Sequence, residues 1–139
     1  MARLLFRCLL LCCLVLLAGC PQAGGKAGAL DRNQIDYSAA IRWGNFEGAW
    51  NLIDPKVRED HPLTDIDFSR YKQVQISSYR ELGTRVLENG DVVREIEIGV
   101  VNKYNLTERT VRYREQWHYD EERKMWWQMS GLPDLWPSD

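Results

Sequence analysis

The order of two hydrophobic patterns constrains the fold of this chain most strongly. Residues 31–60 carry apolar side chains three and four positions apart, which is the period of an amphipathic helix. Residues 71–128 instead alternate apolar and polar side chains, as strands with one buried face do. Asn89-Gly90 interrupts this alternation, and the dipeptide is the strongest short signal for a β-hairpin. The pattern predicts a helical first half followed by an antiparallel meander.

The first helix is expected to end at a clear break. Asp31 or Asn33 can cap its start, because their side chains accept hydrogen bonds from the first turn. The helix would run to about Trp43, where Gly44-Asn45 interrupts the helical pattern.

Two shorter helical segments are expected after this break. An apolar stripe predicts the second, and it consists of Phe46, Ala49, Trp50 and Ile53. Asp54-Pro55 ends that helix and begins a short third one to about Asp60, because the residue before proline avoids the helical region. Residues 61–70 are expected to form a connector.

The second half predicts about four strands. Three of them are indicated by the alternating stretches "YKQVQISSY", "REIEIGVVNKY" and "VRYREQWHY", and the fourth by "MWWQM". Further turns are expected at Asn105–Thr107 and Asp120–Arg123. Helices followed by a meander, without a helix between strands, predict an α+β domain whose helices cover one face of a curved sheet.

The helical hairpin containing "FEGAWNLIDP" and the last strand "MWWQMSGLP" resemble the nuclear transport factor two-like superfamily. The resemblance covers most of residues 30–133 and rests on the order of elements and the placement of aromatic residues. It implies a cone-shaped fold, whose active members use an Asp base with a Tyr or protonated Asp donor, or an Asp/His pair. The alternative is a cystatin-like sheet on one long helix, which the Gly44-Asn45 break disfavours.

The N-terminus predicts an exported protein. Arg3 and Arg7 precede an apolar run over residues 8–19, which is shorter than the ~20 residues that a membrane-spanning helix needs. This is the layout of a signal peptide over residues 1–19. Its end, Leu17-Ala18-Gly19-Cys20, resembles the lipobox of bacterial lipoproteins, which implies cleavage before Cys20 and acylation of that thiol. The alternative is an ordinary signal peptide followed by an incidental cysteine.

The rest of the chain predicts a tether and one domain. Cleavage would remove the other three cysteines and leave Cys20 alone, so no disulfide could form within the mature chain. Residues 20–29, rich in Gly and Ala, are expected to be the acylated Cys and a flexible tether, and residues 30–139 a single domain. By resemblance, Pro21 rather than Asp after the cysteine favours the outer membrane.

The charge of the chain limits the classes of partner. The net charge is −2, and loss of Arg3 and Arg7 with the signal peptide would make it −4. This mild acidity disfavours nucleic acid as a partner and provides no polybasic membrane patch.

Aromatic residues supply the candidate pocket. The aromatic residues can line a cavity or fill the core, and with Glu115 the possible pocket consists of Trp43, Trp50, Tyr113, Glu115, Trp117 and Trp127. Trp126 points opposite to Trp127 on the last strand, and Trp126 and Trp136 are the candidate partner surface.

The ionisable residues do not form a recognisable catalytic set. Glu115 lies between Tyr113 and Trp117 on the expected apolar face, where it could be an acid or base with a raised pKa or could pair with an arginine. We expect Glu115 to pair with an arginine or to reach solvent at the mouth of the cone. His118 is expected on the polar face, and His61 with nearby aspartates matches no metal-ligand spacing.

Three functions follow from these observations. We expect first a lipid-anchored protein of the cell envelope, on the periplasmic side, that binds a protein partner without catalysis, cofactor or metal. The alternatives are binding of a small apolar or sugar-like ligand inside the cone, and an enzyme similar to the isomerases and dehydratases of the superfamily.

Overall fold

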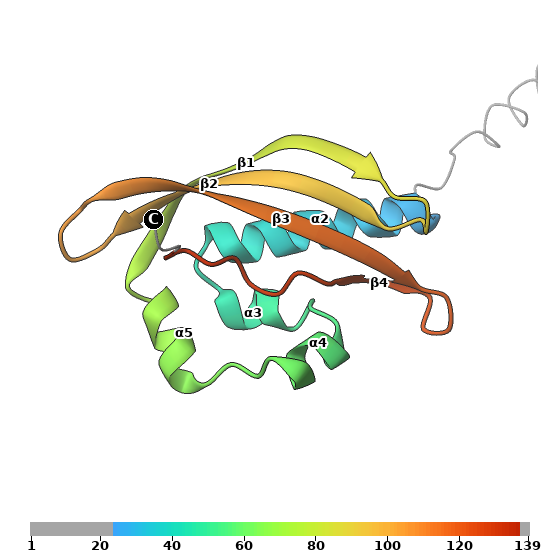
Figure 1. Cartoon of the computed structure of the whole chain (residues 1–139), viewed down its shortest axis with the longest axis horizontal. Helices are drawn as coiled ribbons and strands as arrows, with labels where there is room; N and C mark the ends of the chain where they lie inside the picture. The colour runs from blue at the N-terminus through green and yellow to red at the C-terminus, as the bar shows by residue number, and fades with distance from the viewer. Residues whose placement is uncertain (1–23, 137–139) are drawn as a thin grey trace, which may run out of the picture.

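The computed structural model describes residues 24–136 and confirms the predicted α+β fold (Figure 1). Cys20 and the predicted signal peptide lie outside the described residues. The described elements are α2 (Lys26–Arg42), α3 (Phe46–Trp50), α4 (Pro55–Asp60), α5 (Asp65–Tyr71), β1 (Val74–Val86), β2 (Val92–Asn102), β3 (Glu108–Asp120) and β4 (Met125–Gln128).

Helix α2 begins earlier than the sequence predicts. Its first residue is Lys26, and Gly25 occupies the position before it without a side-chain cap. The predicted start at Asp31 or Asn33 is therefore wrong, and residues 26–29 of the predicted tether are helical. The Trp126 indole donates a hydrogen bond to the Lys26 carbonyl at 2.8 Å, which holds the first turn in place. This contact joins residues a hundred positions apart, so no local signal predicts it.

The end of α2 is where the sequence places it. Gly44 adopts a φ of +72°, which glycine tolerates without steric cost. The N–H of Gly44 donates to the Ile41 carbonyl at 3.0 Å, and that of Asn45 donates to the Ala40 carbonyl at 2.8 Å. These two bonds form a Schellman motif, which terminates a helix and satisfies its last carbonyls.

The next two helices begin where the sequence predicts, but α3 ends at Trp50, before the predicted end at Asp54-Pro55, and Ile53 forms a β-bridge with Gln128 instead. The Asn45 side chain accepts from the Gly48 N–H at the start of α3, and the Asp54 side chain accepts from the Lys56 N–H at the start of α4. Pro55 occupies the first turn of α4, where no partner for its missing N–H is needed.

Helix α5 corrects the prediction of a connector over residues 61–70. Thr64 and Asp67 form a capping box, in which each side chain accepts from the backbone N–H of the other residue. This motif normally carries Glu or Gln at its last position. The capping box could be read from Thr64 and Asp67 in "TDID", but the apolar pattern beside it is short.

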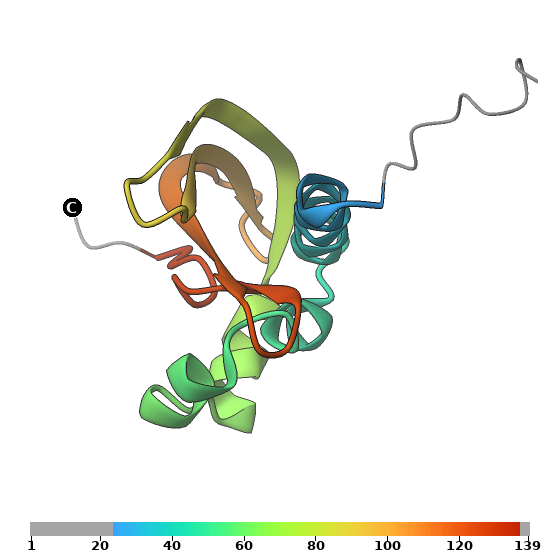
Figure 2. The same cartoon turned by 90° about the vertical axis from the view of Figure 1, so that its right-hand side faces the viewer.

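The sheet is an antiparallel meander in the order β1-β2-β3-β4. Its curvature brings both edges toward α2, which contacts β1 and β4 along the open side of the sheet (Figure 2). Two irregularities in the β1 register, between Ile76 and Ser78 and between Glu81 and Gly83, are bulges, which bend a strand and increase its twist. Helix α2 therefore covers the open side of the curved sheet.

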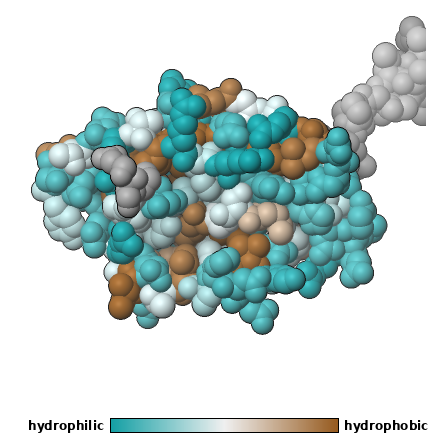
Figure 3. Space-filling model, viewed as in Figure 1, coloured by the Kyte–Doolittle hydropathy of each residue, from teal (hydrophilic) through white to brown (hydrophobic). Residues whose placement is uncertain are grey.

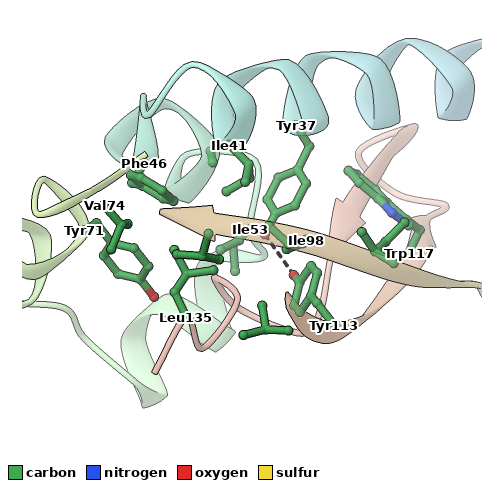
Figure 4. Packing of buried hydrophobic residues seen from close by; sticks show 14 of the residues in the cluster. Tyr37, Ile41, Phe46, Ile53, Tyr71, Val74, Ile98, Tyr113, Trp117 and Leu135 are labelled. Atoms are coloured by element: carbon green, nitrogen blue, oxygen red, sulfur yellow. Dashed lines mark hydrogen bonds between the residues drawn. The ribbon is translucent and has the colours of Figure 1, made fainter. Parts of the chain in front are cut away.

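The inner face of the sheet and α2 enclose one hydrophobic core (Figure 4). As the alternation predicts, Ile96, Ile98 and Val100 are buried on β2. Tyr37 of α2 points into this core, where its hydroxyl lies 2.8 Å from that of Tyr113. The side chains that are 2% exposed or less include Tyr37, Ile41, Phe46, Ile53, Trp117 and Leu135. Side chains thus fill the interior.

Candidate functional site

The structure disperses the predicted aromatic pocket. Tyr113, Glu115 and Trp117 are buried in the core, whereas Trp50 and Trp127 are partly buried at separate surface clefts. A single pocket built from these residues is therefore wrong.

Trp43 lies outside all of these sites, because its side chain is 87% exposed. Its position explains the difference: Tyr37 and Ile41 form the buried stripe of α2, and Trp43 is two residues beyond Ile41, on another side of the helix.

Glu115 is the centre of a buried polar cluster. Arg94 lies directly opposite it across the β2–β3 pair, and the Arg94 Nη1 atom donates to Glu115 Oε2 at 3.2 Å. The Trp117 indole donates to the same oxygen at 2.9 Å, and the Tyr79 hydroxyl donates to the other oxygen. Arg94 also donates to Glu81 at 2.9 Å. The pairing with an arginine is as expected, but Glu115 is 0% exposed rather than near solvent.

Burial and hydrogen bonding have opposite effects on the protonation of Glu115. Burial raises the pKa of Glu115 to about 7, and the hydrogen bond from Trp117 acts against this rise. The Arg94 guanidinium forms an ion pair with Glu115, with its Nη1 atom 3.2 Å from Oε2. Three donors occupy the two carboxylate oxygens, so no substrate proton faces them in this arrangement.

A second polar network crosses the core beside Tyr37. The Tyr113 hydroxyl donates to the Gly131 carbonyl at 2.6 Å, and the Gln128 amide donates to the Tyr113 oxygen. Burial raises the pKa of Tyr37 and of Tyr113 above the usual tyrosine range. Both hydroxyls therefore stay protonated, and they link α2, β3 and the C-terminal segment.

A cleft of about 440 Å³ lies beside the β1–β2 and β3–β4 turns, and its lining includes Lys26, Asp91, His118, Glu121 and Trp127. His118 is about half exposed, as its predicted place on the polar face requires, but its Nδ1 lies 2.7 Å from Asp91 Oδ1. Asp91 is only 4% exposed, and Gln116 donates to its second oxygen at 2.7 Å.

The Asp91–His118 pair was not predicted from the sequence. Burial tends to raise the pKa of Asp91, but the hydrogen bonds from His118 and Gln116 outweigh it and hold that pKa below its usual range. The contact uses Nδ1 and fixes the imidazole ring, so Nε2 remains available to bind a ligand in the cleft. The available signal was the hairpin register, which pairs Val92 with Trp117 and so brings Asp91 beside His118.

A second cleft, of about 330 Å³, is mainly apolar and is lined by Trp50, Val57, His61, Tyr71 and Leu132, among others. Trp50 packs edge-on against Phe68 with ring centroids 6.4 Å apart. Between residues 24 and 136, no three His, Cys, Asp or Glu side chains come together as metal ligands would.

The predicted partner surface requires correction. Trp126 is only 5% exposed, since it faces α2 and packs against Tyr119 with centroids 5.2 Å apart. Trp136 is partly buried against Tyr71 and lies beside the Arg70 guanidinium. The alternation of Trp126 and Trp127 holds, but the buried member of the pair is Trp126, because α2 covers the inner face at β4.

Of the large hydrophobic side chains in the described residues, the three most exposed lie at the end of α2 and on the β2–β3 turn, and four others are exposed elsewhere. Trp43 is 87% exposed, and on the turn Tyr104 and Leu106 are 80% and 77% exposed. Both segments lie toward the left in Figure 1, away from the start of α2. The sequence pattern did not identify Tyr104 and Leu106 as exposed, because the residues of a turn do not alternate regularly between buried and exposed positions.

A comparison with protein-family models finds no match, and a comparison with curated proteins finds no significant match. Among the described helices, none has the length and apolar character needed to cross a membrane.

Proposed function

We propose that the chain is a lipid-anchored protein of the cell envelope that binds a partner protein, without catalysis, through the end of its domain farthest from the tether. The exposure of Trp43, Tyr104 and Leu106 at that end is the observation that carries this proposal.

The short tether supports this orientation. If Cys20 is acylated, only residues 21–25 separate it from α2, and a linker of that length, were it flexible, would have a root-mean-square reach of roughly 12 Å. The cleft that contains Lys26 also contains Gly90 and Glu121, so both hairpin turns lie at the same end as the start of α2. This end would then face the bilayer, and the end with Trp43 would face away from it.

The surface beside the start of α2 is acidic, so the proposed orientation rests on the tether and not on attraction to lipid. Carboxylates outnumber cationic side chains around the cleft, and they include Asp54, Asp91, Asp120, Glu121 and Glu122. Hydrophilic residues cover most of the lower right of the face in Figure 3. Acidic groups gain no attraction from an anionic lipid surface.

The exposed aromatics are typical of a binding surface. Trp and Tyr are enriched among the residues that dominate binding energy at interfaces. Apolar side chains that are exposed close together mark interaction sites more often than scattered ones do. The packed interior adds support, because Arg94, Tyr79 and Trp117 already occupy the Glu115 carboxylate.

The proposal is tested by placing the photo-crosslinking residue benzoylphenylalanine at position 43, 104 or 123 in the lipidated protein in living cells. We expect the same discrete adduct from positions 43 and 104 and none from position 123, which lies on the β3–β4 turn. If only position 123 reacts, or if no position does, the proposed docking end is incorrect.

Small-molecule binding is the second candidate, because the buried Asp91 orients His118 in a cleft of about 440 Å³. In this candidate function the ligand site lies at the surface rather than inside the cone, where the sequence predicted it. Diethyl pyrocarbonate modifies exposed imidazoles, so a sugar or amine that fills the cleft should protect His118 and leave the modification of His61 unchanged. If no compound in such a screen protects His118 selectively, this candidate is rejected.

A further inference from the structure

We infer that the partner presents an acidic segment with one apolar side chain to a groove between the end of α2 and the start of β1. This inference rests on the proposed docking function and specifies the chemistry of its partner.

The groove has a volume of about 330 Å³, and its lining includes Arg42, Trp43, Val74, Ile76 and Lys103. Trp43 provides an exposed ring, and Ile76 is partly buried. A cavity of this size lies within the usual range for small sites and admits one large side chain rather than a whole element. The apolar walls therefore select an apolar side chain.

The charges around the groove select the flanking residues of the partner. Arg42 and Lys103 line it, and its described lining contains no carboxylate. Lys103 Nζ donates to the Lys72 carbonyl at 2.9 Å, and within residues 24–136 no carboxylate forms an ion pair with it. Nearby, Lys72 itself is paired with Glu47 at 3.4 Å. Two cations beside an exposed indole match carboxylates on either side of an apolar residue.

The groove is held in shape before any partner arrives. The Schellman motif at Gly44 fixes the backbone that carries Arg42 and Trp43. On the other side, the Lys103 N–H donates to the Gln73 carbonyl at 3.0 Å and ties the β2–β3 turn to the start of β1. A fixed surface reduces the ordering cost of binding.

The opposite end of the domain has the reverse charge. The cleft beside the hairpin turns is lined by five carboxylates with Lys26 and His118, whereas the groove at Trp43 has only cations. An acidic segment would be repelled by the first site and attracted by the second. The two ends therefore discriminate between partners by charge.

The test uses the lipidated full chain in cells with benzoylphenylalanine at position 104, so that Trp43 is retained. We expect R42E combined with K103E to lower the adduct yield about tenfold or more, because like charges then face each other. The matched control is R85E combined with R123E, two exposed cations toward the other end, and it should leave the yield unchanged. Lys103→Gln, which only removes a charge, should have an intermediate effect, and equal melting temperatures should show that all variants fold.

The site of cross-linking provides the second measurement. Mass spectrometry should find the adduct on a partner peptide in which Asp or Glu flanks an apolar residue. An adduct that survives R42E/K103E, or a cross-linked peptide without carboxylates, overturns this inference and leaves the proposed docking function standing. An adduct at twice the mass of the chain overturns it by assigning the groove to a second copy. Failure of both positions 43 and 104 to react overturns the docking function itself.

Discussion

At the scale of single residues, Glu115 joins three strands of the sheet. Its carboxylate accepts hydrogen bonds from Tyr79 on β1, from Arg94 on β2 and from Trp117 on its own strand, β3. A buried ion pair of this kind does not by itself show high stability, because both charges lose their hydration. Loss of one partner is costly, since the other charge stays buried.

Glu115→Gln is therefore expected to destabilise the domain by about 1–3 kcal/mol, the usual cost of leaving a buried polar group unsatisfied. The amide keeps one acceptor oxygen and places an NH2 group where the other stood, so at least one of the three donors loses its acceptor. Urea unfolding at neutral pH measures the change. The control is Glu108→Gln, whose carboxylate accepts from Ser77 at an exposed position. A Glu115→Gln protein as stable as the parent would show that the cluster is not stabilised by its charge.

Two tryptophans, one buried and one exposed, should differ in how much they contribute to the stability of the domain. Trp117 is 0% exposed and Trp43 is 87% exposed. Trp117→Ala should cost about 3–5 kcal/mol, because it removes a large buried side chain and leaves a cavity. Trp43→Ala should leave the melting temperature nearly unchanged while it weakens docking. A strongly destabilised Trp43→Ala protein would contradict the assignment of Trp43 to a binding surface.

At the scale of elements, α5 depends on its capping box. Thr64 accepts from the Asp67 N–H at 3.3 Å, and Asp67 accepts from the Thr64 N–H at 2.8 Å. Thr64→Ala is expected to reduce the free energy of unfolding by about 1 kcal/mol. Thr64→Ser keeps the hydroxyl and should retain most of it. Equal destabilisation by both substitutions would show that the cap is not the cause.

The link between the β1–β2 turn and β3 should depend on pH. The pKa of Asp91 is lowered in the folded state, so its contribution is complete above its unfolded value of about 3.9 and is lost as the pH falls through the folded value. At pH 7 we expect Asp91→Asn to cost about 1–2 kcal/mol, because it weakens the contacts to His118 and Gln116.

Unfolding of both proteins from neutral pH to below the folded pKa of Asp91 measures this difference. The gap between Asp91→Asn and the parent should close as the solution becomes acidic. Asp36→Asn, at an exposed position on α2, should change little at any pH. A gap that widens on acidification would contradict the expected role of the Asp91 carboxylate.

At the scale of the whole molecule, the proposed tether at Cys20 determines whether the domain is held at a membrane. Cys20→Ala should block acylation, so the protein should remain uncleaved or be found in the soluble fraction. Membrane fractionation and the intact mass of the protein measure both effects. If the variant still fractionates with outer membranes at the normal mature mass, Cys20 is not the anchor.

The sequence by itself determined the elements that depend on neighbouring residues. Periods of two and of three to four residues separate strands from helices, Asn89-Gly90 marks the first hairpin, and Gly44-Asn45 ends α2. These signals act within one turn of backbone, so they can be interpreted without knowledge of the fold. The capping box at Thr64 is also local, and a search for it would have found α5.

The tertiary structure decided which of these side chains meet. The start of α2 at Lys26 and the burial of Trp126 both follow from one contact between residues a hundred positions apart. The Asp91–His118 pair requires the register of β2 against β3, and the exposure of Trp43 depends on which side of α2 faces the sheet. Burial is set by surfaces that come together only after folding, and hydrophobicity along the chain does not specify which surfaces these are.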